Sequence, residues 1–175
     1  AFTSLVNLIG TKQNVEKEMG GKENAFYTLY LLSVCGHLGM VITGDAFNLY
    51  VLLEIAALSG YALLGMGSGR AAFSTLNYLF IGTIGASLYL LGVGYLYITT
   101  GSLNMLDIAE ILSKSGLNDT ATMAFCLIMV GVMIKMAFFP VHAWLPNAYS
   151  HAPSAASSLI APMTTKVMIY VMIRM

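Results

Sequence analysis

Residues 135–174 read KMAFFPVHAWLPNAYSHAPSAASSLIAPMTTKVMIYVMIR, and this stretch decides the predicted fold. Lys135 lies in an apolar run, about one helical turn before Pro140. Because proline lacks a backbone N–H and its ring clashes with the preceding turn, we expect a broken helix near Pro140. A second apolar helix, which contains Lys166, follows the polar and aromatic connector of residues 141–153. The stretch therefore predicts two apolar helices, each with an amine in its interior, on either side of a helix break.

The composition of the whole chain indicates that lipid is its solvent. Of the 175 residues, 58% are hydrophobic and 9% are charged, whereas a soluble domain has about 45–50% apolar and about 25% charged residues. So few charged side chains would not cover a surface in water. The net charge of zero gives no reason to expect a nucleic-acid partner. We predict an all-α fold, a polytopic transmembrane helix bundle in a lipid bilayer.

Five apolar runs approach the length of about 20 residues that a helix needs to cross a bilayer. They are residues 25–42, 46–65, 73–98, 121–139 and 154–175. We expect residues 1–24 to be the end of a preceding helix followed by a solvated loop, because residues 11–24 hold six charged side chains. Since both ends of the chain are apolar, we interpret it as a fragment of a longer polypeptide, with one five-helix unit in residues 25–175.

Shorter signals predict how the apolar helices begin and pack. Asp45 precedes the second run and is a fair N-cap for it. Residues 104–114 have apolar side chains at helical spacing, which predicts a short helix lying on the membrane surface. Small residues in the third run would let neighbouring helix backbones approach closely. These residues are Gly82, Gly85, Gly92 and Gly94.

The basic residues predict the orientation in the membrane. With five crossings, one side of the membrane receives Lys12, Lys17, Lys22 and Arg70. The other side receives Lys114 and Arg174. Lys and Arg are in excess in cytoplasmic loops, so we expect residues 11–24 to lie in the cytoplasm.

Three ionisable residues lie inside the predicted spans, namely Glu54, Lys135 and Lys166. A charged side chain at the centre of a membrane helix costs about 2.5–3.5 kcal/mol on insertion scales, so such residues usually have a function. Burial favours the neutral form of a lysine, whereas a nearby carboxylate favours its charged form. A small movement of Glu54 relative to Lys135 would therefore load or unload a proton, and Lys166 would take it onward. The alternative is a purely structural role, in which the three charges only pair helices with one another.

A second group of residues is predicted to assist as a relay or gate. It consists of His37, His142, His151, Thr164 and Thr165. The lone His37 on an apolar helix is more often a hydrogen-bonded packing residue than a functional one. His142 and His151 belong to the polar connector, part of which is also typical of an interfacial loop. The two threonines are placed to hydrogen-bond carbonyls freed by the helix break, or to hold water beside Lys166.

Redox chemistry and metal binding find no support in the sequence. Cys35 and Cys126 are far apart, and the chain has no CxxC motif or Cys/His ligand cluster. No Gly-rich dinucleotide fingerprint follows a predicted strand. We therefore expect no cofactor, no metal and no catalytic residue in this chain, although it is compatible with a subunit of an ion-translocating oxidoreductase.

Two segments resemble a known family. These are TGDAFNLYVLLEI at residues 43–55 and the stretch quoted above for residues 135–174. They are similar to the antiporter-like membrane subunits shared by respiratory complex I, Mrp-type cation/proton antiporters and membrane-bound hydrogenases, with the D-type Mrp subunit and its hydrogenase relatives most similar. The resemblance implies two inverted five-helix repeats, each with a broken helix, of which this chain would cover one. It also implies that Glu54 is the family's acidic residue, Lys135 its central lysine and Lys166 its next lysine, and that His142 belongs to its HxWLP segment.

The expected function is translocation of protons, or exchange of a cation for protons, in a larger complex. The partners would be sibling antiporter-like and small membrane subunits. The transported ions would be protons, with Na⁺ as the open alternative, and the location would be a prokaryotic cell (inner) membrane. The alternative is an inert scaffold subunit of an NADH:quinone oxidoreductase-like complex. The sequence does not separate proton from sodium transport, or an antiporter from a redox-driven pump.

Overall fold

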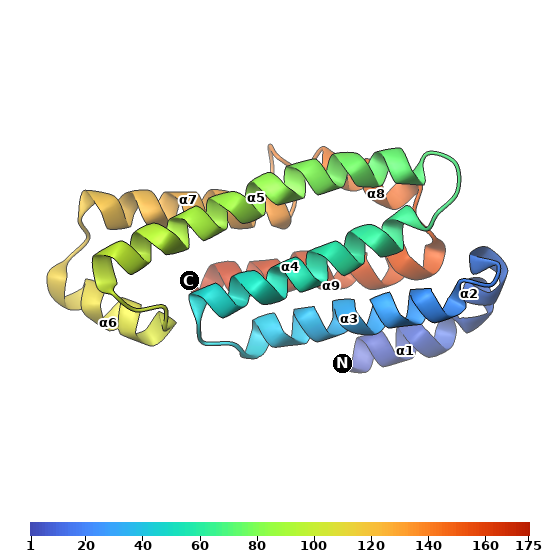
Figure 1. Ribbon diagram of the computed structural model, residues 1–175, viewed down its shortest axis with the longest axis horizontal. Helices are drawn as coiled ribbons and strands as arrows, with labels where there is room; N and C mark the ends of the chain where they lie inside the picture. Colours follow the sequence, from blue (N-terminus) through green and yellow to red (C-terminus); the bar gives the residue numbers. More distant parts are fainter.

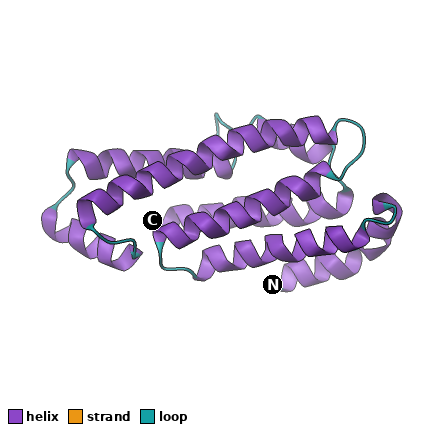
Figure 2. Cartoon of the chain, in the orientation of Figure 1, coloured by secondary structure: helices purple, strands orange, loops and turns teal.

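A computed structural model describes residues 1–175 as nine α-helices joined by short loops (Figures 1 and 2). The helices are α1 (Phe2–Gly10), α2 (Lys12–Met19), α3 (Glu23–Ile42), α4 (Ala46–Gly65), α5 (Ala71–Thr100), α6 (Met105–Ser115), α7 (Asp119–Lys135), α8 (Trp144–Ser150) and α9 (Ser154–Arg174). The long helices run side by side along one axis (Figure 1). Helices α5 and α7 pack together on one side, and α3 packs on α4. The predicted all-α bundle is confirmed.

Four helices are long and apolar enough to cross a membrane, namely α3, α4, α5 and α9. Helix α7 has 17 residues and ends part of the way along the bundle, where α8 takes over on the same side (Figure 1). The predicted fourth span over residues 121–139 is therefore shorter than expected, because α7 ends at Lys135, and α8 begins only after the connector, at Trp144. The break separates two helical pieces rather than kinking one continuous helix.

The N-terminal segment differs from the solvated loop that was predicted for residues 11–24. Residues 12–19 form α2, because Val15 and Met19 lie on one face, four residues apart, and are both buried. They pack in a core cluster with residues of α3 and α9. Glu18 on α2 accepts a hydrogen bond from the backbone N–H of Ser154, at 3.0 Å, and so caps the start of α9. The charges of this segment are exposed, while its two apolar side chains attach it to the bundle.

Helices α5 and α7 make the closest contact in the bundle, and glycines make this contact possible. A Cβ atom on Gly92 would lie 2.7 Å from the carbonyl oxygen of Ala124 on α7. One on Gly131 of α7 would lie 2.6 Å from the carbonyl oxygen of Gly85. Close approach at Gly85 and Gly92 agrees with the sequence-based prediction, whereas Gly94 faces open space.

Backbone hydrogen bonds fasten the turn between α3 and α4 to the loop between α5 and α6. The N–H of Ala46 donates to the carbonyl of Leu103 at 2.8 Å, and the N–H of Met105 donates to the carbonyl of Gly44 at 2.9 Å. Asp45 caps α4 as predicted, because its carboxylate accepts from the N–H of Asn48 at 2.7 Å. The predicted short helix after residue 104 is present as α6.

The break after α7 begins earlier than Pro140, where it was predicted. Helix α7 ends at Lys135, and Ala137 adopts a left-handed conformation with φ of 56°. The N–H of Phe138 donates to the carbonyl of Met133, and the N–H of Ala137 to that of Ile134. This pair of bonds is a Schellman motif, which ends a helix by its own local geometry. Pro140 lies within the connector that follows and prevents the helix from resuming.

The indole of Trp144 also supports the end of α7. Its Nε1–H donates to the carbonyl of Ile134 at 3.2 Å, and its ring stacks on Tyr78 of α5 with centroids 4.0 Å apart. The predicted partners of the freed carbonyls were Thr164 and Thr165, and neither contacts them. Thr164 bonds His37 and Thr165 bonds the carbonyl of Ala161 in its own helix. Trp144 takes this role because it begins α8 and is 3% exposed, facing the interior.

The glycine contact predicts a difference between two otherwise equal substitutions on α5. Gly92→Ala should lower the free energy of unfolding by about 1–3 kcal/mol, because the new Cβ has to push α7 away. Gly94→Ala should leave it unchanged or raise it, since the added methyl group meets nothing within 4 Å. Thermal unfolding of the purified full-length subunit in detergent measures both. Equal stability of the two variants would contradict the tight α5–α7 contact.

The left-handed residue at the break predicts a stabilising glycine. A non-glycine residue in this conformation costs about 1–2 kcal/mol, so Ala137→Gly should raise the midpoint of thermal unfolding. The matched control is Ala109→Gly at an exposed position in the middle of α6, which should lower the free energy of unfolding by about 0.5–1 kcal/mol. A loss of stability in both variants would show that Ala137 is not held in the left-handed region.

Candidate functional site

Lys135 is the most deeply buried charged residue of the chain, with 4% of its side chain exposed. It is the last residue of α7, so it lies where the carbonyl groups of the helix end and present a negative pole. Its Nζ atom donates a hydrogen bond to the hydroxyl of Tyr61 at 3.3 Å. The same Nζ lies 3.6 Å from Oε1 of Glu54. The ammonium thus stands between two partners on one face of α4.

Glu54 forms an ion pair with Lys135 that is not a full hydrogen bond. Its Oε1 atom is buried and has no hydrogen-bond partner, although the side chain as a whole is 27% exposed. Glu54 and Tyr61 are seven residues apart on α4, which brings them to the same face two turns apart. The structure therefore brings together two of the three charges that the sequence singled out. It leaves their contact looser than that of an ordinary salt bridge.

His37 and Lys135 line the same small cavity. This cavity of about 20 Å³, room for about one water molecule, is lined by both residues and by Thr164. His37 is buried, with Nδ1 at 2.7 Å from the carbonyl of Ser33 and Nε2 at 3.1 Å from the hydroxyl of Thr164. Because a carbonyl only accepts, Nδ1 carries the proton and Nε2 of the neutral ring accepts from Thr164. Nε2 is therefore the unprotonated ring nitrogen of His37, and its lone pair accepts the hydrogen bond of the Thr164 hydroxyl.

Lys166 does not join this cluster within the chain. Thr164 faces inward toward His37, and two residues along a helix turn the side chain by about 200°. Lys166 accordingly lies on the outer face of α9, where its side chain is exposed. Thr165, between them, bonds only its own helix. The predicted line of three charges is thus a pair in the interior and a third charge on the surface of the bundle.

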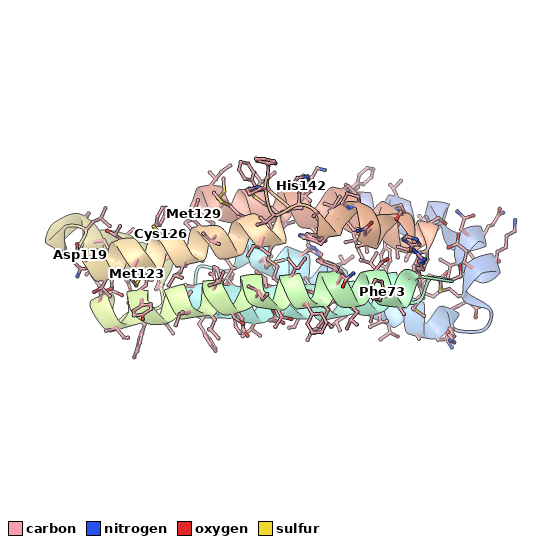
Figure 3. All side chains as sticks on the ribbon, turned by 90° about the horizontal axis from the view of Figure 1, so that it is seen from above. Phe73, Asp119, Met123, Cys126, Met129 and His142 are labelled. Carbon is pink, nitrogen blue, oxygen red and sulfur yellow. The ribbon has the colours of Figure 1, made fainter.

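His142 and Pro140 lie in the connector between α7 and α8 and are exposed. Figure 3 shows the side chain of His142 at the outer edge of the molecule. Its ring lies near that of Phe139, with centroids 5.7 Å apart. His142 has no contact with the buried pair.

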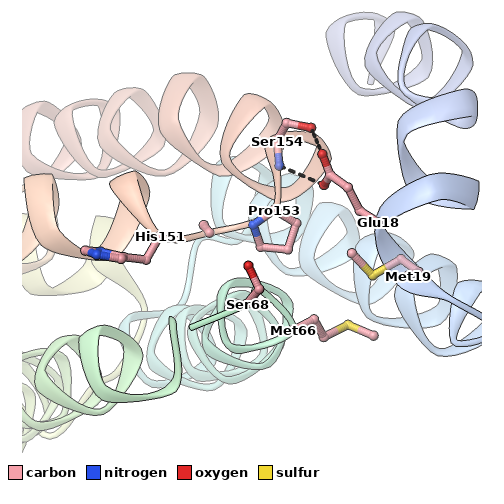
Figure 4. A pocket seen from close by; sticks show the side chains of 9 residues that line it. Glu18, Met19, Met66, Ser68, His151, Pro153 and Ser154 are labelled. Carbon is pink, nitrogen blue, oxygen red and sulfur yellow. Dashed lines mark hydrogen bonds between the residues drawn. The ribbon is translucent and has the colours of Figure 1, made fainter. Parts of the chain in front are cut away.

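His151 borders a second, larger cavity at the end of the bundle. This cavity of about 410 Å³ lies between α2, the α4–α5 loop and the start of α9 (Figure 4). Ser68 and Ser154 line it with His151, and Figure 4 shows Glu18 bonded to Ser154 at its edge. Nδ1 of His151 is 3.4 Å from the hydroxyl of Ser74 on α5. This is the end of the bundle where α2 and Arg70 lie, and it carries four of the eight Lys and Arg residues of the chain.

Tyr61 and Trp144 are site residues that sequence reasoning missed. Tyr61 is 4% exposed and provides the only side-chain hydrogen bond of Lys135. Its spacing of seven from Glu54 was a signal that the two share a face, but the sequence did not indicate that Lys135 reaches both. Trp144 has no local signal for its bond to Ile134, because that bond depends on where α8 begins.

Comparison with known proteins agrees with this architecture. Residues 43–175 match the family described as NADH:quinone oxidoreductase/Mrp antiporter, TM. NADH-quinone oxidoreductase subunit N of Desulforudis audaxviator is 45% identical over 174 residues, which is 99% of this chain and 35% of that protein. The D-type subunit of the Na⁺/H⁺ antiporter of Bacillus subtilis is 34% identical over 157 residues, which is 87% of this chain and 31% of that protein. The sequence identity to the oxidoreductase subunit is thus higher than the identity to this D-type antiporter subunit.

A solved structure shares the fold as well. A chain of the membrane-bound sulfane sulfur reductase, an archaeal respiratory membrane complex, superimposes with a TM-score of 0.78 at 37% identity, over 82% of this chain and 30% of that one. The chain therefore spans about a third of the length of the relatives that it matches. The family match over residues 43–175 and the apolar helices establish that the chain is a multi-pass integral membrane protein that belongs to the NADH:quinone oxidoreductase/Mrp antiporter transmembrane family.

Proposed function

We propose that the subunit containing this chain moves protons across the membrane, and that Glu54 and Lys135 form its loading site. The observation that carries the proposal is a buried lysine at the end of a broken helix, 3.6 Å from a carboxylate. A lysine buried this deeply in a membrane helix is costly, and such residues usually mark an ion pathway. Broken helices beside ionisable groups recur in ion carriers, where the helix end helps to hold a cation.

The loose contact between the two side chains suits transfer of a proton. The buried amine favours its neutral form when its partner is distant and its charged form when the carboxylate is near. A change of about 1 Å in the separation of Nζ and Oε1 converts the observed pair into a hydrogen-bonded one or parts it further. The two groups would titrate as one coupled unit, so that their movement loads and unloads a single proton.

His37 is the next acceptor that we propose within the chain. His37 lines the water-sized cavity that Lys135 also lines, and its Nε2 is hydrogen-bonded to Thr164, a third lining residue. One water molecule in this cavity would link the amine to the imidazole. Lys166, on the outer face of α9, would act at the contact with a part of the protein beyond this chain. His142 and His151 would act only at the surfaces of the bundle, where they are exposed.

The cavity beside His151 and α2 marks the side from which we propose that protons arrive. This end of the bundle holds Lys12, Lys17, Lys22 and Arg70, and by the excess of positive charge it would face the cytoplasm. Sibling membrane subunits of a larger complex would supply the driving reaction. Two relatives carry the names of an oxidoreductase subunit and a Na⁺/H⁺ antiporter subunit, so redox-driven pumping and cation exchange both remain within the proposal.

Removing either charge of the pair should stop transport. Lys135→Met and Glu54→Gln in the full-length subunit should each lower proton movement by about 100-fold, because each removes a positioned proton-transfer group. The measurement is the cation- or redox-driven pH change in inverted membrane vesicles, with assembly of the complex checked on a native gel. Lys114→Met is the matched control, because Lys114 is exposed and pairs only with Glu110 on α6. Normal proton flux in an assembled complex with Lys135→Met would contradict the proposal and would indicate that the chain is an inert scaffold.

A substitution at His37 separates a relay from a packing role. His37→Gln retains a side chain that can donate to the carbonyl of Ser33 and accept from Thr164, but it does not take up a proton near neutral pH. We expect an assembled complex whose transport is slowed by about ten-fold or more. Wild-type rates in this variant would show that His37 is only a hydrogen-bonded packing residue, as its lone position on an apolar helix first suggested.

A further inference from the structure

Tyr61 occupies a position that packing alone does not explain. Its hydroxyl receives the hydrogen bond of Lys135 at 3.3 Å, a shorter distance than the 3.6 Å from Nζ to Glu54. Oε1 of Glu54 is meanwhile buried without a hydrogen-bond partner. A protonated amine has three donors and could serve both oxygens at bonding distance. The ammonium instead lies within bonding distance of the phenol and just outside that of the carboxylate.

The space for the Tyr61 hydroxyl exists only because residue 82 is glycine. A Cβ atom on Gly82 of α5 would lie 2.0 Å from the phenolic oxygen and 3.1 Å from Cζ. Even alanine at this position would therefore displace the hydroxyl. Gly82 thus differs from Gly85 and Gly92, which make room for the backbone of α7.

The ring of Tyr61 also packs against an aromatic residue of α5. Tyr78 meets it edge-on, with centroids 4.5 Å apart and the planes at 89°. Tyr78 stacks in turn on Trp144, the first residue of α8. The ring of Tyr61 therefore packs on α5 at both Tyr78 and Gly82, and Trp144 supports Tyr78 from behind, which limits the freedom of the phenol to follow Lys135 toward Glu54.

We propose that Tyr61 is a positioning residue, whose hydroxyl, seated in the gap at Gly82, holds the Lys135 ammonium just beyond hydrogen-bonding distance of Glu54. The inference rests on the proposed function and names the groups that control its ion pair. A charge-assisted hydrogen bond between lysine and glutamate at about 2.7–2.9 Å is roughly twice as strong as a neutral one. By competing for the ammonium, the phenol keeps the pair from closing into that bond, so the proton is released more quickly.

The decisive variant is Tyr61→Phe, which removes one oxygen atom and keeps the edge-on contact of the ring with Tyr78. Without the phenol, Nζ moves to Oε1, the pair closes, and we expect proton movement in the assembled complex to fall by about ten-fold. Tyr149→Phe is the matched control. It also removes a buried tyrosine hydroxyl, but one that has no hydrogen-bond partner, so its transport should equal that of the wild type.

A second substitution distinguishes positioning from a general loss of structure. Glu54→Asp shortens the acid by one methylene group and so reopens the distance that Tyr61→Phe has closed. In the Tyr61→Phe subunit, Glu54→Asp should restore at least part of the lost flux, although in the wild type it lowers flux. A merely structural tyrosine would make the two losses multiply, and that result would overturn the proposal.

The glycine gives an independent check. Gly82→Ala should slow transport in the wild type, because it displaces the phenol, yet change it little in the Tyr61→Phe subunit, where the clashing oxygen is absent. Gly94→Ala on the same helix is the control for the added methyl group. Should Gly82→Ala prevent assembly, the Tyr61 series still decides the question.

The results also separate this inference from the function on which it rests. If Glu54→Gln and Lys135→Met abolish flux while Tyr61→Phe transports normally, the pair conducts but Tyr61 does not position it. If the two charge variants themselves transport normally, both the function and the positioning role are wrong. Loss of flux in Tyr61→Phe with recovery by Glu54→Asp supports both.

Discussion

A membrane interior offers no water to a peptide group, and this constraint governs where α7 is allowed to stop. A helix end in lipid leaves carbonyl groups without partners, and it is tolerated only where the protein supplies them. Here the Schellman motif at Ala137 and the indole of Trp144 provide hydrogen bonds to the last turn. Helix α5 covers the same region at glycine contacts that bring the two backbones together. The last turn of α7 is therefore enclosed, with Ile134, Lys135 and Met136 buried, although the connector that follows is exposed.

The enclosed helix end is also what makes room for a charge. Lys135 is the final residue of α7, so its ammonium lies near the negative pole of the helix and next to a carboxylate from α4. A helix end contributes about 0.3–1 kcal/mol to a nearby cation at a surface, and up to about 2 kcal/mol when partly buried. If α7 continued as far as Pro140, the negative end of the helix would lie about one turn beyond Lys135 and would stabilise its charge less. The position of the break and the position of the charge are one structural feature.

Sequence reasoning was most successful where one strong local signal decides the structure. Hydrophobic length defined the boundaries of α4 to the residue, and Asp45 was rightly identified as its cap. It failed where two signals compete or where contacts are distant. The many charges of residues 11–24 predicted a loop, although two buried apolar side chains make α2 a helix. Pro140 predicted the place of the helix break, although the helix already ends before the left-handed Ala137.

The candidate site shows the same division. The rarity of charge in apolar helices was sufficient to single out Glu54 and Lys135, which the structure places together. Helical periodicity from Thr164 would have placed Lys166 on the opposite face of α9, but only once the inward face of that helix was known. The role of Tyr61 depends on the missing side chain of Gly82, a contact between two helices that no local pattern encodes.

The incomplete pairing of Lys135 is better understood as a requirement of its proposed task than as a defect of packing. A buried amine with every donor satisfied by carboxylate would be stable, and it would also retain its proton. Lys135 instead has a neutral phenol, a carboxylate slightly out of reach, and a cavity of one water volume toward His37. Each compensates the charge only in part. A proton held by several weak partners has a path to leave, which a single strong partner would close.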